Sequence, residues 1–344
     1  MLILAVETSC DETSAAVLRD GLVLSNVISS QLFHNRYGGV VPEMASREHT
    51  KNIVLITKKA LSDAGVKLED IDAVSATTSP GLIGALLVGM NFAKALAFSL
   101  GIPFIPVNHI HAHLYSNFLD GEKPPFPFLS LIVSGGHTIL IKADDYFRHE
   151  ILGKTLDDAA GEAFDKVAKM LGLPYPGGPE IDRLAKTGRE DFHAFPISRT
   201  KDNPFDFSFS GIKTSVLYYL RDIGFKEMDG AEKQKLTADI AASFQKTMVD
   251  TLFGRVMLAS KKYGIKNIAV AGGVSANSAL KRKFEDLEKK GYQIFIPPPA
   301  YTTDNAAMIG LAAYYEYMNS KDRQYFEEDS FAVNASPRLD YENF

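Results

Sequence analysis

Residues 2–18, LILAVETSCDETSAAVL, and residues 128–142, FLSLIVSGGHTILIK, share one pattern, and that pattern decides the fold. Each begins with an apolar run, turns through hydroxyl-bearing or glycine residues, and returns as a second apolar run. This arrangement is typical of a β-hairpin. Its recurrence in both halves of the chain predicts two pseudo-symmetric domains. The similar turns, at residues 7–13 and 134–138, indicate that the domains close on a nucleotide.

The remaining chain alternates strand and helix patterns. A third glycine turn, AGGVSAN at residues 271–277, follows the apolar run 267–270 and precedes the helical segment 278–289. Alternation of this kind predicts an α/β fold with a largely parallel sheet core. We expect one domain to contain residues 1–108 and about 305–344, and the other to contain residues 109–304.

Composition limits the classes of function. The chain has 344 residues, of which 46% are hydrophobic and 23% charged, so it is globular and long enough for two domains. Its one cysteine excludes an internal disulfide and favours a cytoplasmic location. The net charge of −5 argues against a generally basic surface. A nucleic-acid site must therefore be a local patch or be shared with a partner.

Residues 82–107 form the most membrane-like stretch. Asn91, Lys94 and Ser99 interrupt it, and Gly101-Ile102-Pro103 breaks it. We therefore interpret it as a buried helix followed by a strand, and expect no membrane partner.

The sequence VNHIHAHLYS, residues 107–116, has metal-ligand spacing. Asn108 is suited to cap a helix that begins at His109. Residues four apart share a helix face, so His109 and His113 would point the same way and His111 away. Two such imidazoles bind a divalent ion if a third ligand arrives from elsewhere. Ordinary buried or surface histidines are the alternative, but three of the chain's eight histidines within five residues favour a metal.

Eight motifs in order resemble one family. They are ETSCDET, HIHAH, SGGHT, GEAFDK, YPGGP, DFSFSGIKT, AGGVSAN and TDNAAMIG, and they extend from residue 3 to about 312. Together they resemble the tRNA threonylcarbamoyladenosine transferases of the actin and sugar-kinase superfamily. Because the sequence has no fused kinase-like segment, it resembles the bacterial or organellar branch of the family. The resemblance implies two actin-like, RNase H-like domains with a nucleotide cleft between them.

The family's reaction is implied in the same way. A threonylcarbamoyl group passes from threonylcarbamoyl-AMP to N6 of adenine 37 in tRNAs that read ANN codons, which forms t6A and releases AMP. The implied partners are tRNA, a paralogue of the same fold and a small P-loop ATPase. Because the exocyclic amine is a poor nucleophile, catalysis must activate the acyl carbon and align both reactants.

The resemblance assigns the metal ligands. His109 and His113 match the family's metal histidines, and Asp304 matches its carboxylate ligand. One divalent ion is expected, with Fe²⁺ as the first choice and Zn²⁺ as the alternative. For Asp304 alone, capping of the helix that follows it is an equally physical role.

The resemblance also assigns a donor site. Ser134, Gly135 and Gly136 offer backbone N–H groups that could form an anion nest, although Gly-Gly is also a common hairpin signal. Seen singly, Asp165 and Asp182 would be solvated acids on helix faces. The full set of substrate-binding residues is Ile132, Val133, Ser134, Gly135, Gly136, Asp165, Gly178, Asp182 and Asn277.

Asp11 and Glu12 are the candidate catalytic residues. Paired carboxylates in a turn can hold one raised pKa through mutual repulsion, and the sequence leaves open which of them takes the proton. Neighbouring Cys10 leaves a covalent acyl-thiol route open. Lys213 is either a phosphate or tRNA contact or a surface lysine. Two basic clusters are candidate tRNA contacts: Arg183, Lys186, Arg189, Arg199 and Lys201, and then Lys281, Arg282 and Lys283.

Other classes of function compete with the transferase. An ATP-dependent small-molecule kinase of the same superfold would need an acidic base and Mg²⁺ but no histidine-rich helix. A metallopeptidase lacks support because the chain contains no H-E-x-x-H motif. A non-catalytic scaffold would be expected to have lost the metal histidines.

Overall fold

The computed structural model describes residues 1–31, 33–34, 37–197, 200, 202–339 and 344. These residues form two compact units, one made of Met1–Lys123 and Pro297–Phe344, the other of Pro124–Ile296. The boundaries therefore differ from the expected ones after residue 108 and near residue 305. The reason is that helix α3 (His109–Tyr115) packs against helix α9 (Ala306–Asn319), which keeps both in the first unit.

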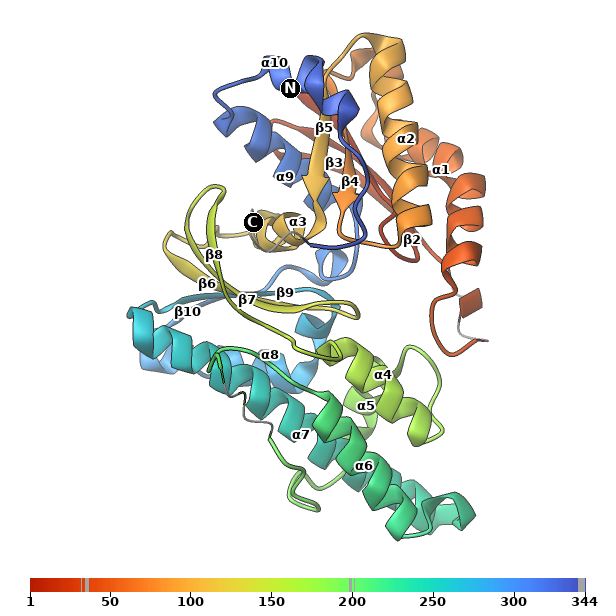
Figure 1. Ribbon diagram of the computed structural model, residues 1–344, viewed down its shortest axis with the longest axis vertical. Helices are drawn as coiled ribbons and strands as arrows, with labels where there is room; N and C mark the ends of the chain where they lie inside the picture. Colours follow the sequence, from red (N-terminus) through yellow and green to blue (C-terminus); the bar gives the residue numbers. More distant parts are fainter. Residues whose placement is uncertain (32, 35–36, 198–199, 201, 340–343) are drawn as a thin grey trace. The chain divides into compact units, whose positions relative to one another are not determined.

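The first unit is built on a mixed sheet with the strand order β3-β2-β1-β4-β5. The predicted N-terminal hairpin is confirmed, because β1 and β2 pair antiparallel with Val6 opposite Ala15. Strands β4 and β5 continue the sheet parallel to β1. Figure 1 shows α1 and α2 on one face of this sheet and α9 on the other. The bounds are β1 Leu2–Glu7, β2 Glu12–Arg19, β3 Leu22–Ser30, α1 Pro42–Ala64, β4 Ala73–Ser79, α2 Ile83–Leu100 and β5 Phe104–Asn108.

The second unit repeats this topology. Its strand order is β10-β9-β6-β7-β8, with β6 and β7 forming the second predicted hairpin and β9 running parallel to β6. The pseudo-duplication is thus confirmed, whereas the expected largely parallel core is wrong, since each hairpin contributes antiparallel neighbours. The bounds are β6 Phe128–Val133, β7 Thr138–Asp145, β8 Arg148–Lys154, α4 Ala160–Met170, α5 Gly177–Ala185, α6 Ser210–Asp222, α7 Gly230–Tyr263, β9 Asn267–Ala271, α8 Ser278–Glu285 and β10 Gln293–Phe295.

Helix α2 is the one helix among the described residues that is long and apolar enough to cross a membrane by length and composition. Small residues at four-residue spacing, Ala85, Gly89, Ala93 and Ala97, bury one of its faces. The predicted helix followed by a strand is confirmed. The helix is buried on that face only, and Phe98 on another face is 80% exposed.

Candidate active site

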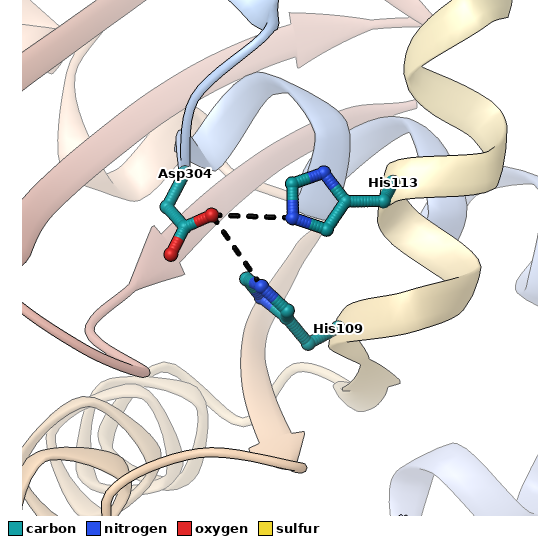
Figure 2. A group of neighbouring side chains, drawn as sticks. All are labelled: His109, His113 and Asp304. Atoms are coloured by element: carbon teal, nitrogen blue, oxygen red, sulfur yellow. Dashed lines mark ion pairs between the residues drawn. The ribbon is translucent and has the colours of Figure 1, made fainter. Parts of the chain in front are cut away.

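Two histidines and one aspartate converge in the first unit. Nε2 of His109 lies 3.5 Å from Oδ1 of Asp304, and Nε2 of His113 lies 3.2 Å from the same oxygen. One ligand atom from each residue lies within 4.8 Å of the others. Figure 2 shows both imidazoles projecting from α3 toward the carboxylate. The structure therefore brings together the three residues expected to be metal ligands.

Two asparagine caps create this geometry. The Asn108 side chain accepts hydrogen bonds from the backbone N–H groups of Ile110, at 2.8 Å, and His111, so α3 begins at His109 as predicted. Helix α9 is capped by Asn305, whose side chain accepts from Met308 N at 3.0 Å. Because Asn305 is the cap, Asp304 does not fill that role and its carboxylate faces the histidines.

His111 lies apart from the cluster, as the helical spacing predicted. Its ring centroid lies 4.5 Å from that of Phe344. His111 is not among the residues whose ligand atoms converge with Asp304.

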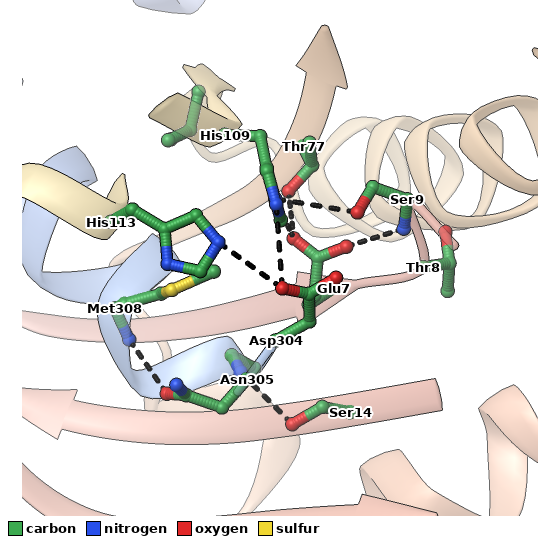
Figure 3. Close-up of polar contacts among 12 residues, drawn as sticks. Glu7, Thr8, Ser9, Ser14, Thr77, His109, His113, Asp304, Asn305 and Met308 are labelled. Atoms are coloured by element: carbon green, nitrogen blue, oxygen red, sulfur yellow. Dashed lines mark hydrogen bonds and ion pairs between the residues drawn. The ribbon is translucent and has the colours of Figure 1, made fainter. Parts of the chain in front are cut away.

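A third carboxylate, Glu7, lies behind His109 at the end of β1. Its Oε2 lies 3.2 Å from Nδ1 of His109, and its side chain is fully buried. The Thr77 hydroxyl and the Ser9 backbone N–H both donate to this carboxylate (Figure 3). A metal-ligating histidine commonly donates its second nitrogen to a carboxylate in this way. Glu7 thus orients His109 with Nε2 toward Asp304.

The charges of the cluster are strongly coupled. Burial by itself lowers the pKa of His109, but the charges of Asp304 and Glu7 outweigh it and raise the pKa to about 10. Burial and the charge of His109 both lower the pKa of His113. Burial raises the pKa of Asp304, yet His109 holds that pKa well below its usual range. The site therefore draws positive charge to the space between the imidazoles and the carboxylate.

The donor set fits a divalent ion. Nδ1 of the fully buried His113 has no hydrogen-bond partner within the described part of the chain, and Nε2 has only the ion-pair contact of 3.2 Å with Asp304. A buried imidazole that contacts a single carboxylate and leaves its other nitrogen without a partner is costly unless a further ligand completes it. Two imidazole nitrogens and one carboxylate oxygen suit Fe²⁺ or Zn²⁺ and leave coordination positions for a substrate.

We expect Glu7→Gln to weaken metal binding about 10–100-fold, the range typical for loss of an outer carboxylate partner. The amide keeps the shape of Glu7 but removes the charge that orients His109. A competition titration of Zn²⁺ against a chelator measures this affinity. Thr77→Val is the matched control, because it removes a hydrogen bond to Glu7 and leaves the carboxylate; it should be milder. Equal affinity in Glu7→Gln and the unaltered chain would contradict this role.

The hairpin turn that carries Asp11 and Glu12 belongs to the same unit. Burial, followed by the charges of Asp304 and Asp11, raises the pKa of Glu12 well above its ordinary value. The expected raised pKa therefore falls on Glu12, and burial rather than mutual repulsion is its largest cause. Burial and the charge of Asp11 also raise the pKa of the Cys10 thiol, which disfavours the thiolate that an acyl-thiol route needs.

His49 of α1 makes hydrogen bonds to residues on either side of Asp11 and Glu12 in this turn. Its Nε2 lies 2.9 Å from the Cys10 carbonyl, which can only accept, so Nε2 donates. Its Nδ1 then accepts from the Thr13 hydroxyl at 2.9 Å. Burial lowers the pKa of His49, in keeping with this neutral tautomer. Hydrogen bonds on both sides thus fix the backbone of the acidic pair.

In the second unit, the 134–137 turn is tight and lies beside the start of α4. Ser134 N donates to the His137 carbonyl at 2.8 Å, and Gly161 N donates to the Ser134 carbonyl at 3.1 Å. A Cβ on Gly161 would lie 2.6 Å from that carbonyl oxygen, so only glycine fits there. Gly135 and Gly136 are exposed, with open space where a side chain would be. Their backbone can therefore be approached closely by a ligand.

Asp165 anchors the turn that carries Gly178. Its Oδ1 accepts from Gly177 N, at the start of α5, at 2.7 Å. A Cβ on Gly177 would lie 2.3 Å from that of Ala168, which explains the glycine, whereas Gly178 faces open space. The YPGGP turn is thus pressed against α4 and presents the Gly178 backbone outward.

Asp182 joins α5 to α8, and Asn277 joins α8 to α7. Asp182 accepts from the Ser278 hydroxyl at 2.8 Å. The Asn277 oxygen caps α8 by accepting from Leu280 N at 3.0 Å, and its amide donates to Gln245 at 2.7 Å. The side chains of Ile132 and Val133 are buried in β6, so only their backbone can face a ligand. These contacts show a supporting role, and direct ligand contacts stay a prediction.

The candidate tRNA lysines and arginines have mixed environments. Lys213 is paired with Asp158 and is largely buried, so it is not a simple surface lysine. Arg189 lies 2.8 Å from Asp239, and Lys281 lies 3.7 Å from Glu285. Arg199 and Lys201 lie outside the described residues.

The comparisons with known proteins identify the family. A family model described as tRNA N6-adenosine threonylcarbamoyltransferase matches residues 22–311. The chain belongs to this family. A relative with that name from Chloroherpeton thalassium is 53% identical over 91% of the chain and 92% of its own length. Another, from Clostridium botulinum, is 51% identical over 98% and 97%.

Solved structures support the fold alone. Component A of the (R)-2-hydroxyglutaryl-CoA dehydratase of Acidaminococcus fermentans is 16% identical, with a TM-score of 0.52, and the match covers 93% of this chain and all of that one. Full-length HypF is 15% identical with a TM-score of 0.60, covering 93% of this chain and 47% of that chain. The two-sheet architecture is therefore shared beyond the family.

Proposed function

We propose that this protein transfers a threonylcarbamoyl group to N6 of an adenine beside the anticodon of tRNAs that read ANN codons. The donor is threonylcarbamoyl-AMP, and the products are t6A and AMP. The observation that carries the proposal is the convergence of His109, His113 and Asp304 in a chain of the threonylcarbamoyltransferase family.

The residues divide the work according to their chemistry. His109, His113 and Asp304 would hold one divalent ion, Fe²⁺ first and Zn²⁺ second, which supplies a Lewis acid for the acyl end of the donor. The N–H groups of Gly135 and Gly136 would bind the phosphate, because the N–H of Ser134 already donates to the His137 carbonyl, and the Asp165 carboxylate would bind the ribose. Glu12, whose pKa is raised, would exchange a proton with the reacting amine, with Asp11 beside it.

The partners and location follow from the family and the composition. A paralogue of the same fold and a small P-loop ATPase would assist, because a chain with a net charge of −5 needs help to bind a polyanion. A single cysteine suits a cytoplasmic location. The comparisons give no support to the kinase alternative.

The decisive assay supplies preformed threonylcarbamoyl-AMP, unmodified tRNA and the candidate partners, with and without this chain. Mass spectrometry of the digested tRNA measures t6A. We expect t6A to form only in the presence of the chain. Formation at the same rate without it would refute the proposal, and phosphorylation of a small molecule from ATP would support a kinase instead.

Asp165→Ala should weaken binding of a non-hydrolysable donor analogue by about 1.5–3 kcal/mol, since a ribose hydroxyl loses a charged acceptor. Isothermal calorimetry measures the change. Because Asp165 also accepts from Gly177 N, Asp165→Asn is the control: it keeps an acceptor for Gly177 and removes the charge. If the alanine variant binds with unchanged affinity, Asp165 does not contact the ribose. If Asp165→Asn is as stable as the unaltered chain, any loss of donor affinity in that variant comes from the missing charge and not from a loosened turn.

A further inference from the structure

A pocket of about 670 Å³ lies between α4, α6 and the short helical turn Phe225–Glu227 in the second unit. None of the residues assigned to the donor or the metal lines it. Apolar and charged side chains both line it. The residues that shape the argument below are Lys169, Met170, Leu217, Tyr218, Arg221 and Lys226.

The apolar part of the pocket is open rather than packed. Leu217 is 45% exposed and its neighbour Tyr218 52% exposed, both on α6. Phe225, which also lines the pocket, is buried. Single exposed apolar residues are ordinary, but adjacent ones on the wall of a pocket indicate a surface that a flat apolar group could cover.

The rim is cationic on a chain that is acidic overall. The lining includes four basic side chains and one carboxylate, whereas the whole chain carries −5. Lys166 is held by Asp158 at 2.9 Å and Glu162 at 2.8 Å, and Arg221 lies 3.0 Å from Asp222, so the charges of these two side chains are already balanced. Lys169 and Lys226 are exposed and form no ion pair with any other described residue.

An aromatic–cation pair completes the surface. The Arg221 guanidinium lies 4.9 Å from the centre of the Tyr218 ring. Tyrosine and arginine are the side chains on which unpaired bases stack, and nearby lysines neutralise the adjoining phosphates. A protein partner would need an apolar residue flanked by acidic groups, whereas every nucleotide carries a flat ring beside a phosphate.

We propose that this pocket binds an unpaired nucleotide of the tRNA, with its base against Tyr218 and its flanking phosphates at Lys169 and Lys226. The inference rests on the proposed function for the identity of the RNA. It assigns a tRNA contact to α4 and α6, outside the basic clusters at residues 183–201 and 281–283.

The test measures the affinity of the full chain, with its partners, for an unmodified tRNA transcript by fluorescence anisotropy over a series of salt concentrations, in the absence of donor. Lys169→Glu combined with Lys226→Glu should raise the dissociation constant at least about tenfold and reduce the salt slope by roughly 2. Tyr218→Ala should raise it about 5–150-fold, and Tyr218→Phe should restore binding because the ring remains.

Lys261 is an exposed lysine near the end of α7, and Lys261→Glu is the charge control. It should leave the dissociation constant and the salt slope unchanged. Unchanged tRNA affinity in the double-lysine and Tyr218→Ala variants would overturn the inference. A loss of tRNA affinity in Lys261→Glu or Tyr218→Phe as large as in the pocket variants would also overturn it. So would pocket variants that no longer bind a partner protein but keep their affinity for tRNA. If the unaltered chain makes t6A while these variants bind tRNA normally, only this inference fails. If tRNA binding responds as expected but no t6A forms, only the proposed function fails.

Discussion

Replacing His113 by alanine should remove the bound metal and the transferase activity together. His113 is fully buried, its Nε2 shares Oδ1 of Asp304 with His109, and no further described histidine, cysteine or carboxylate belongs to the converging group. Loss of a direct ligand should exceed the roughly 100-fold upper limit typical for loss of an outer partner. We expect the same result for His109→Ala and Asp304→Ala.

The measurement combines elemental analysis of the purified protein with the t6A assay. His111→Ala is the matched control, because it removes an imidazole from the same helix while its ring packs against Phe344. It should keep both metal and activity. Full metal occupancy in His113→Ala would show that the cluster is not the ligand set. If His111→Ala loses as much metal and activity as His113→Ala, the position of a histidine on the helix face does not decide metal binding.

The fold was predictable where the pattern was local. The hairpins at residues 2–18 and 128–142 follow from an alternation of apolar runs and turn residues, which acts over a few residues. The domain boundary could not be predicted in this way, because it depends on α3 packing against α9, which lies nearly 200 residues later in the chain. The sheets are mixed for a related reason: a hairpin fixes antiparallel neighbours, and helical crossovers then add parallel ones.

The metal cluster was partly predictable from spacing. An asparagine cap and histidines four residues apart placed two ligands on one face of a helix. Glu7 was missed, although an acidic residue directly after the apolar run Leu2–Val6 was a signal, because burial beside His109 arises only when β1, β4 and α3 meet. His49 gave no comparable signal, since its partners, Cys10 and Thr13, lie on a different element.

The donor half of the site shows why motif residues are hard to assign from sequence. Asp165, Asp182 and Asn277 each hold a turn or cap a helix in the second unit. Such a residue serves a ligand indirectly, by fixing the backbone that approaches it. The glycines of the same motifs therefore indicate the ligand site more directly than these side chains do, because each glycine marks a place where the backbone is either crowded or open to a ligand.

Gly272→Ala and Gly135→Ala should separate these two roles. A Cβ on Gly272 would lie 2.4 Å from the Val133 carbonyl oxygen, and its φ of +86° with ψ of 163° is a conformation that essentially only glycine adopts. We expect Gly272→Ala to lower the free energy of unfolding by about 2–5 kcal/mol, through strain and overpacking where β9 meets the end of β6. Chemical denaturation measures it.

Gly135→Ala should behave in the opposite way. Nothing lies within 4 Å of the added methyl group, and the residue is exposed, so stability should change by no more than about 0.5 kcal/mol. The methyl would, however, stand where a phosphate approaches the Ser134–Gly136 backbone, so calorimetry should show weaker donor binding. A Gly272→Ala protein as stable as the unaltered chain would contradict the crowding at the end of β6. Unchanged donor affinity in Gly135→Ala would make the turn an ordinary hairpin, because a backbone that cradles a phosphate has no room for a side chain in between.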